Sequence, residues 1–188
     1  MNEVIQLWLP VLAAAIFVFV ASSLIHMVLK WHNSDYRKLA NEDDVRAVIR
    51  AGSPAPGQYT MPHCVDMKEM QTEAVQNRFR EGPVALMTVK ANAMPSMGPT
   101  LGAWYVLNLV VALVAAAVSL HAFGFGADAA CRAGCLGGIL TFMSYSIGSV
   151  SNGIWMGRPW SAVAKDLLDA AIYGAVTGLA FWWLWPGG

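Results

Sequence analysis

Charged side chains are scarce in this chain of 188 residues, in which Lys, Arg, Asp and Glu make up only 13%. A soluble domain carries about a quarter charged residues. Nine of the twelve Lys and Arg residues, and eight of the twelve Asp and Glu residues, lie between Lys30 and Lys90. The remainder is almost uncharged, which excludes an ordinary soluble domain and is typical of a membrane protein with one polar segment.

Cysteine is also rare, and the sequence has only Cys64, Cys131 and Cys135. Three cysteines exclude a disulfide framework, and we interpret Cys131 and Cys135 as small buried hydrophobic residues. Lys and Arg are absent from the N-terminal "MNEVIQ", and the apolar run that follows is longer than the core of a signal peptide. We therefore expect this run to be a retained helix.

Four stretches are long enough to cross a bilayer, which takes about 20 apolar residues. They cover residues 5–29, 99–123, 127–150 and 161–185. The sequence therefore predicts an all-α membrane protein with four transmembrane helices. We divide it into a first helix within 1–29, a polar segment over 30–98, and three further helices within 99–188.

The positive charges predict an orientation, because Lys and Arg are retained on the cytoplasmic side of a membrane. Segment 30–98 carries nine of them, whereas the N-terminal tail, the turn at 124–126 and the C-terminal "PGG" carry none. We therefore predict that both termini are periplasmic and that segment 30–98 is cytoplasmic. Trp8 and Trp182 would then lie at the outer interface and Trp155 at the inner one, where amphipathic rings are favoured.

The polar segment contains two helix signals. Asn41 is a good N-cap before three acidic residues, and Gly52 is placed to end that helix. Asp66 and Glu69 have a spacing close to a capping box, which predicts a second helix beginning near Asp66. The intervening "SPAPGQYTMPH" has three prolines and a glycine and is typical of an irregular loop, while "VALMTV" is either a short strand or an extended lead into the next helix. We expect a small, mainly helical cytoplasmic segment.

The stretch "MPHCVDMKEM" offers a possible metal site in the polar segment. His63, Cys64, Asp66 and Glu69 carry imidazole, thiolate and carboxylate groups, all of which are zinc ligands. Adjacent His63 and Cys64 rarely bind one ion, however, and no second pair such as C-x-x-C is present. Capping already explains the two acids, so we favour the end of a loop and the start of a helix over a metal site.

Two G-x-x-x-G spacings occur in the last two predicted spans, at Gly134 and Gly138 and at Gly174 and Gly178. Such spacings let two helix backbones approach closely in lipid. We favour packing of these two helices against each other within one chain. A contact between subunits is the alternative.

Polar residues within the spans predict a buried cluster, because an ionisable side chain in lipid is costly and faces protein or water. Asp169 lies eight residues into the fourth span, a depth of about 12 Å. Lys165, one turn earlier, can pair with Asp169 along the helix. Asn108 reaches a similar depth, Ser144 and Tyr145 are a little shallower, and His26 is shallower again. These depths predict a polar cluster in the inner third of the bundle, centred on Asp169. We favour a structural clamp over a proton relay or solute site.

Three stretches carry a resemblance to a known family: "PAPGQYTMPHCVDMKEM", "EGPVALMTV" and "GRPWSAVAKDLLDAAIYGAVTGLAFWWLWP". They resemble an uncharacterised family of small bacterial four-helix inner-membrane proteins, and the resemblance covers most of the chain. It implies a bacterial inner membrane and no particular activity.

We expect an accessory or scaffold protein of the inner membrane that acts by helix packing in a homo-oligomer or a larger complex. The sequence has no phosphate loop, catalytic serine motif or paired-carboxylate motif, so we do not expect an enzyme. Its expected partners are membrane lipids and copies of itself or other membrane subunits, with no nucleic acid. Apart from lipid we expect no cofactor.

Two alternatives remain open. One is a small oligomeric channel or transporter, with a path lined by Asn108, Ser144, Ser146, Asn152 and Asp169. The less favoured one is a redox subunit holding haem or quinone through His26 and His121. Those two histidines are predicted near opposite membrane faces, so they cannot ligate one haem together.

Overall fold

The structure is a computed structural model and describes residues 5–187. Four of its helices are long and apolar enough to cross a membrane, so the prediction of four such helices is confirmed. Their bounds are Trp8–Leu29, Met97–Phe123, Ala127–Met156 and Trp160–Leu184. The first consists of α2 (Trp8–Ser23) and a π-helical continuation, η1 (Leu24–Leu29).

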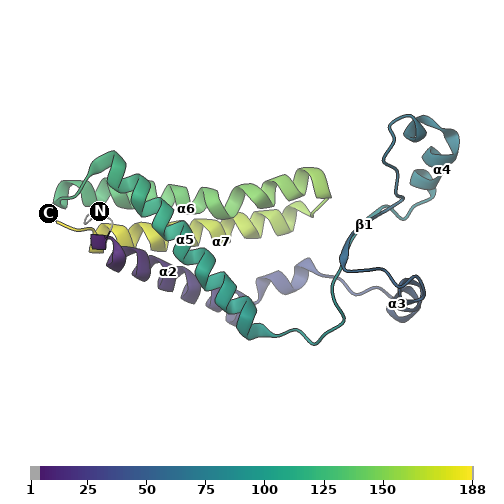
Figure 1. Cartoon of the computed structure of the whole chain (residues 1–188), viewed down its shortest axis with the longest axis horizontal. Coiled ribbons are helices and arrows are strands. Elements are labelled where there is room, and N and C mark those ends of the chain that lie inside the picture. Colours follow the sequence, from purple (N-terminus) through teal and green to yellow (C-terminus); the bar gives the residue numbers. More distant parts are fainter. Residues whose placement is uncertain (1–4, 188) are drawn as a thin grey trace. The chain divides into compact units, whose positions relative to one another are not determined.

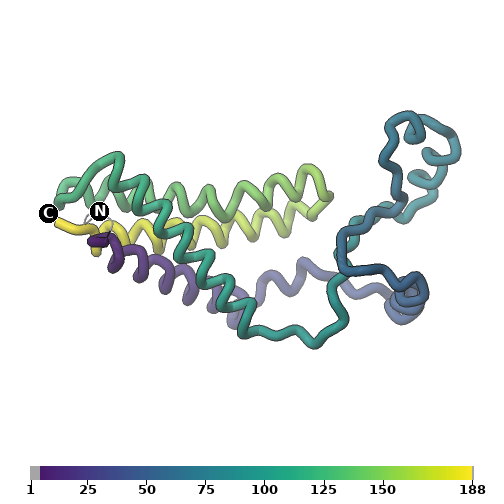
Figure 2. Tube along the Cα trace, in the orientation of Figure 1, coloured from purple at the N-terminus to yellow at the C-terminus, as the bar shows by residue number. Residues whose placement is uncertain are grey.

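The chain divides into two compact units, which we describe separately. One unit, the bundle, contains the residues up to Arg37 and from Ser96 onward, and the other is Lys38–Pro95. The bundle is built from α2 with η1, α5 (Met97–Phe123), α6 (Ala127–Met156) and α7 (Trp160–Leu184), as Figures 1 and 2 show.

Each helix of the bundle runs opposite to the one before it (Figure 1). Helix η1 and α6 therefore end, and α5 and α7 begin, at one end of the bundle, which we call the long-loop end because segment 38–95 is connected there. The opposite end, where residues 124–126 join α5 to α6, we call the short-turn end.

Small residues dominate the core of the bundle. Alanines from all four helices are almost fully buried, and they surround the larger side chains of Leu7, Phe181 and Trp185 toward the short-turn end. In lipid there is little hydrophobic gain from bringing helices together, so close backbone approach and dispersion must stabilise the packing. The buried alanines are Ala14, Ala15, Ala112, Ala115, Ala116, Ala129, Ala133, Ala162, Ala170 and Ala180.

The four glycines of the two G-x-x-x-G spacings meet where α6 and α7 cross. A Cβ atom added to Gly138 would lie 2.8 Å from the carbonyl oxygen of Gly174, and one added to Gly174 would lie 2.6 Å from that of Gly138. A Cβ on Gly134 would lie 2.7 Å from the oxygen of Gly178. No side chain fits at these positions unless the helices separate, so the glycines set the spacing of α6 and α7.

The second unit combines two short α-helices with a two-stranded sheet. Its elements are α3 (Glu42–Ala51), β1 (Gly57–Met61), η3 (Glu69–Gln71), α4 (Glu73–Glu81) and β2 (Ala85–Val89). Helix α3 begins after Asn41 and ends at Gly52, as the sequence predicts. Strand β1 pairs antiparallel with β2, with Gly57 opposite Val89 and Met61 opposite Ala85.

Two sequence expectations in this unit are wrong. Residues 57–61 form β1 and not an irregular loop, because the backbone groups of "GQYTM" find their partners in β2, far along the chain. The second helix begins at Glu73 and not near Asp66. The carboxylate of Asp66 instead accepts a hydrogen bond from the backbone N–H of Lys68 at 2.8 Å, which closes a local turn.

Candidate functional site

A one-turn 3₁₀ helix, η2 (Trp31–Asp35), brings polar side chains against α7 at the long-loop end. It follows Lys30, whose φ of 53° places the backbone in the left-handed region and turns the chain away from η1. Trp31, His32 and Asp35 then contact Lys165 and Asp169 of α7. These residues, together with Asp166 and its two partners, form what we call the Asp169 network. Its members are Trp31, His32, Asp35, Ser149, Arg158, Lys165, Asp166 and Asp169.

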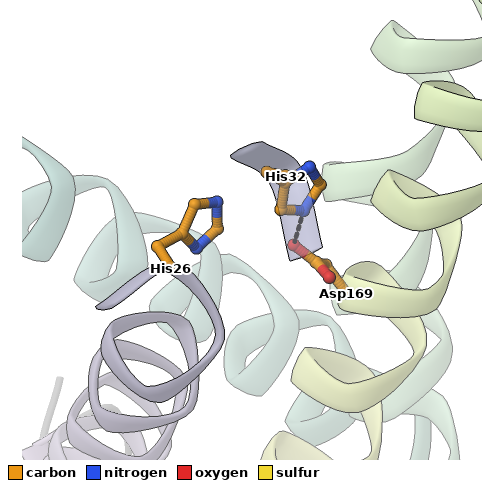
Figure 3. A group of neighbouring side chains, drawn as sticks. All are labelled: His26, His32 and Asp169. Atoms are coloured by element: carbon orange, nitrogen blue, oxygen red, sulfur yellow. Dashed lines mark hydrogen bonds and ion pairs between the residues drawn. The ribbon is translucent and has the colours of Figure 1, made fainter. Parts of the chain in front are cut away.

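Asp169 is buried in α7 and has partners on both carboxylate oxygens. The indole N–H of Trp31 donates to its Oδ1 at 3.1 Å, and Nε2 of His32 lies 2.9 Å from its Oδ2 (Figure 3). Both partners come from η2. The cost of burying this carboxylate is therefore offset by contacts that tie η2 to α7.

Lys165 pairs with η2 and not with Asp169, so the predicted pairing along the helix is wrong. Its ammonium lies 2.5 Å from Oδ1 of Asp35 and also donates to the Trp31 carbonyl at 2.8 Å and the Ser34 hydroxyl at 2.7 Å. Three acceptors on η2 satisfy all three N–H groups of the ammonium. A single neighbour on α7 could not do this.

Asp166 is the third carboxylate of the network. Arg158, just beyond the end of α6, lies 2.9 Å from its Oδ2 and donates to its Oδ1 at 3.0 Å. The hydroxyl of Ser149 donates to the same carboxylate. These contacts join α6 to α7 near their connection.

Contacts between η2 and α7 shift the pKa values of Asp35 and His32 in opposite directions. The hydrogen bond from Lys165 lowers the pKa of the Asp35 carboxyl, burial opposes that shift, and His32 adds to it. For His32, burial lowers the pKa, but the hydrogen bonds to Asp35 and Asp169 and the charges of both outweigh it, so the pKa is raised. Both shifts favour charged groups within the network.

His26 lies beside this network on η1 and is exposed. Its ring stacks on that of His32, with 4.9 Å between the ring centroids and 7° between the planes. Its Nδ1 lies 2.9 Å from the Ser22 carbonyl oxygen. One ligand atom from each of His26, His32 and Asp169 lies within 4.8 Å of the other two, as drawn in Figure 3.

A pocket of about 300 Å³ opens next to these residues at the long-loop end. Side chains from η1, α5, α6 and α7 line it, with acidic, basic and phenolic groups together. They are His26, Trp104, Tyr145, Ser149, Asn152, Arg158, Asp166, Asp169 and Tyr173. The pocket can therefore hold water or a small polar ligand.

The other predicted members of the cluster make no hydrogen bond to Asp169 within residues 5–187, although Tyr145 lines the same pocket. The hydroxyl of Tyr145 donates to Oδ1 of Asn108 at 2.7 Å, and Nδ2 of the buried Asn108 has no hydrogen-bond partner in the part of the chain that the structure describes. Tyr173 connects this pair to the network, with its ring centroid 5.3 Å from that of Tyr145. Ser144 is exposed and donates to the Leu140 carbonyl of its own helix, so it does not join the cluster.

No known protein family, curated protein or solved structure matches this chain. The site is therefore interpreted from its geometry.

The residues of "MPHCVDMKEM" do not converge on one point. Nδ1 of His63 lies 3.2 Å from the Thr60 hydroxyl, and the Cys64 thiol donates to the Asp66 carbonyl at 3.4 Å. Within residues 5–187, the group of three that meets metal-site spacing is His26, His32 and Asp169. Glu69 begins η3 and is exposed.

Sequence reasoning misses His32 and Asp35, although both stand in "WHNSD" directly after the first span. Because residues 30–98 are predicted to form a separate polar segment, the side chains just past Leu29 are not expected to lie near Asp169. Two ligand-type residues within two turns of the end of a transmembrane helix are the signal that points to them.

A second feature is a shallow groove of about 700 Å³ along α6 and α7, which we call the α6–α7 groove. Glycines and alanines form much of it, and Cys131 and Cys135 are exposed within it, so the expectation that they are buried is wrong. It is lined by Cys131, Gly134, Cys135, Gly138, Ile139, Phe142, Ala171, Gly174, Ala175, Gly178, Leu179 and Trp182.

His121 lies at the other end of the bundle from His26, near the end of α5.

Proposed function

We propose that this protein is an accessory or scaffold protein of the bacterial inner membrane that associates with a second copy of itself through the α6–α7 groove. The observation that carries the proposal is the groove itself, an apolar furrow along two helices that are apolar enough to cross a membrane. The function is then to hold helices together and not to convert a substrate.

The chemistry of the groove favours a helix as its occupant. Lipid tails are as apolar as leucine, so helices associate in a membrane where small residues let backbones approach closely. The small residues that remain exposed or half-buried along the groove provide such a surface, namely Cys135, Gly138, Ala171, Ala175 and Gly178. In the most apolar 18-residue stretch of each span, only 28–39% of the residues are buried inside the chain. Much of the surface of each helix therefore remains available for contact.

A second copy of this chain is a suitable partner because, in a two-fold symmetric contact, both copies present the same surface. Ile139 and Leu179 border the groove and are 59% and 58% exposed. In a two-fold symmetric contact, Ile139 of α6 or Leu179 of α7 on one copy would pack into the groove of the other. Closed two-fold dimers are the commonest homo-oligomers.

The Asp169 network supports a structural role for the charged residues. Asp35, Asp166 and Asp169 each contact a cationic or hydrogen-bond donor group of the same chain. The network ties η2 and the end of α6 to α7 and so keeps α6 and α7 in a fixed arrangement. A rigid pair of helices loses less conformational freedom when it binds another pair.

The proposed orientation places segment 38–95 in the cytoplasm and both termini in the periplasm. Nine of twelve Lys and Arg residues between Lys30 and Lys90 support this orientation. Exposed tryptophans at both ends of the bundle support two interfaces: Trp8 and Trp182 at the short-turn end, Trp155 and Trp160 at the long-loop end.

Filling the groove tests the proposal. Ala175 is exposed in the groove, so Ala175→Trp places a large ring there without touching the glycine crossing of α6 and α7. Val114 on α5 is 57% exposed outside the groove, so Val114→Trp is the matched control. We expect light scattering in mild detergent to give a dimer for the wild type and for Val114→Trp, and a monomer for Ala175→Trp. A monomeric wild type, or a dimeric Ala175→Trp, would contradict the proposal.

Passage of a small cation or polar solute is a second candidate function, favoured by the polar pocket of about 300 Å³ beside Asp166 and Asp169. Liposomes containing Asp169→Asn separate the two candidates. Loss of proton or solute flux with the dimer intact would favour transport. Loss of the dimer together with lowered thermal stability would favour a clamp.

A further inference from the structure

Three side chains with metal-binding atoms converge at the long-loop end from three different elements. His26 comes from η1, His32 from η2 and Asp169 from α7 (Figure 3). Nε2 of His32 lies 2.9 Å from Oδ2 of Asp169, and one ligand atom from each of the three residues lies within 4.8 Å of the others. From this convergence we propose that His26, His32 and Asp169 bind one divalent transition-metal ion.

Each histidine is oriented by a hydrogen bond at its Nδ1. The Ser22 carbonyl can only accept, so Nδ1 of His26, 2.9 Å away, carries the proton in the neutral ring. Nδ1 of His32 lies 2.7 Å from a carboxylate oxygen of Asp35. With Nδ1 protonated in both rings, Nε2 is the metal-binding atom of each. The Nε2 lone pair of His26 is free, whereas Nε2 of His32 donates to Asp169 and would exchange that proton for the ion. Metal-binding histidines are typically held in this way by a carbonyl or carboxylate behind the ring.

The third ligand, the carboxylate of Asp169, is also oriented by a hydrogen bond. Trp31 donates to Oδ1 of Asp169, which fixes the carboxylate and leaves Oδ2 directed at His32. An ion between Nε2 of His32 and Oδ2 of Asp169 would replace their direct hydrogen bond. Two imidazoles and one carboxylate with open positions bind zinc, iron(II) or manganese(II).

The balance of fixed charge favours a bound cation. Three carboxylates face two cationic side chains, namely Asp35, Asp166 and Asp169 against Arg158 and Lys165. An excess negative charge in a partly buried site is costly. A proton on His32 can offset this excess, and so can a divalent ion coordinated by Asp169 in its place. The pocket of about 300 Å³ that His26 and Asp169 line gives the ion a route in and room for a water ligand.

One adjustment is required. Two ligand atoms about 2.1 Å from one ion are at most about 4.2 Å apart, which is slightly less than the spread of this group. His26 is the residue that can move, because it is exposed and lies outside the network, where its ring bonds to the Ser22 carbonyl and stacks on His32. His32 and Asp169 are held by the network.

The test is zinc binding to the full chain, purified in detergent and stripped with EDTA, measured by competition with a zinc-sensitive dye. We expect one tight site per chain. His26→Ala removes one ligand without breaking the network, and we expect its affinity to fall tenfold or more. His121→Ala, which removes an exposed histidine at the other end of the bundle, should bind as the wild type does.

A second readout is the visible spectrum of bound Co²⁺, whose bands should change in His26→Ala and in Asp169→Asn. The amide oxygen introduced by Asp169→Asn can still accept from Trp31, and if that variant does not fold, His26→Ala decides the question alone. Failure of the wild type to bind zinc at micromolar concentration would overturn the proposal. Equal affinity of His26→Ala and the wild type would also overturn it, because the ion would then lie elsewhere. Neither result depends on whether the chain forms a dimer.

Discussion

Tyr145 and Asn108 hold α5 and α6 together by one buried hydrogen bond. The Tyr145 hydroxyl donates to Oδ1 of Asn108 at 2.7 Å, and the amide nitrogen of Asn108 has no other partner among residues 5–187. Tyr145→Phe leaves both ends of this amide unpaired. We expect a loss of about 1 kcal/mol in unfolding free energy, which is within the range for hydrogen bonds between membrane helices.

Thermal or SDS unfolding in detergent measures this loss, with Tyr105→Phe as the control. Tyr105 lies on α5, one turn before Asn108, and is partly buried, and its hydroxyl has no hydrogen bond within the described residues. Equal stability of Tyr145→Phe and Tyr105→Phe would show that the hydrogen bond contributes nothing.

Depth along a helix predicts the contact between Asn108 and Tyr145 but does not predict that Ser144 is exposed. Asn108 and Tyr145 lie at similar depth on neighbouring helices, and they do meet. Ser144 has nearly the same depth, but it is turned by about 100° from Tyr145 around the helix axis and is exposed. Depth can be read from the sequence. The face of an almost uniformly apolar helix cannot, because no polar stripe marks which side is buried.

At the scale of elements, Lys165 and Asp35 fix the position of η2 on α7. The side chain of Asp35 is only 6% exposed, and Lys165 is its nearest cation, with 2.5 Å between Nζ and Oδ1. Lys165→Met leaves that carboxylate with His32 alone. We expect a loss of about 2 kcal/mol, the size of a hydrogen bond to a charged group.

A double-mutant cycle checks that the loss comes from this pair. Asp35→Asn with Lys165→Met should be less destabilising than the sum of the two single changes. Simple additivity in thermal unfolding would mean that the two side chains are not coupled.

Two glycines of α6 and α7 should differ in how well they tolerate an added side chain. A Cβ on Gly174 would lie 2.6 Å from the Gly138 carbonyl oxygen, whereas a Cβ on Gly148 would meet nothing within 4 Å. Gly174→Ala forces the helices apart and should cost about 1–3 kcal/mol. Gly148→Ala should be neutral or stabilise α6 by about 0.5–1 kcal/mol, because alanine favours helix. Unfolding in SDS compares the two, and equal stabilities would contradict the close crossing.

The elements differ in how far the sequence predicts them. The long helices follow from apolar composition alone, and α3 from Asn41, three acids and Gly52. Strand β1 does not follow from the sequence, because its pairing with β2 is a contact between distant parts of the chain and leaves no local periodicity. The predicted start of α4 is wrong for a related reason, since Asp66 forms a local turn with the same spacing as a cap.

At the scale of the whole molecule, the network around Asp169 depends on contacts that span most of the chain. Trp31 and Asp169 are 138 positions apart, and His32 and Asp169 are 137 apart. The sequence predicts that Asp169 needs partners, because a carboxylate in a span is costly. It does not identify them, because that requires knowing how η2 folds back after Lys30.

The orientation of the chain in the membrane determines which compartment segment 38–95 faces, and labelling of Cys64 can test it. Cys64 lies in segment 38–95, while Cys131 and Cys135 lie on α6. In a Cys131→Ser, Cys135→Ser background, Cys64 is the only thiol. If the positive charges between Lys30 and Lys90 keep this segment in the cytoplasm, a membrane-impermeant maleimide should not label Cys64 in intact cells but should label it after permeabilisation. A cysteine placed at Gly187, beyond the end of α7, is the matched control and should be labelled in both cases. Labelling of Cys64 in intact cells would reverse the orientation, and would place the Asp169 network and its metal ligands at the periplasmic face.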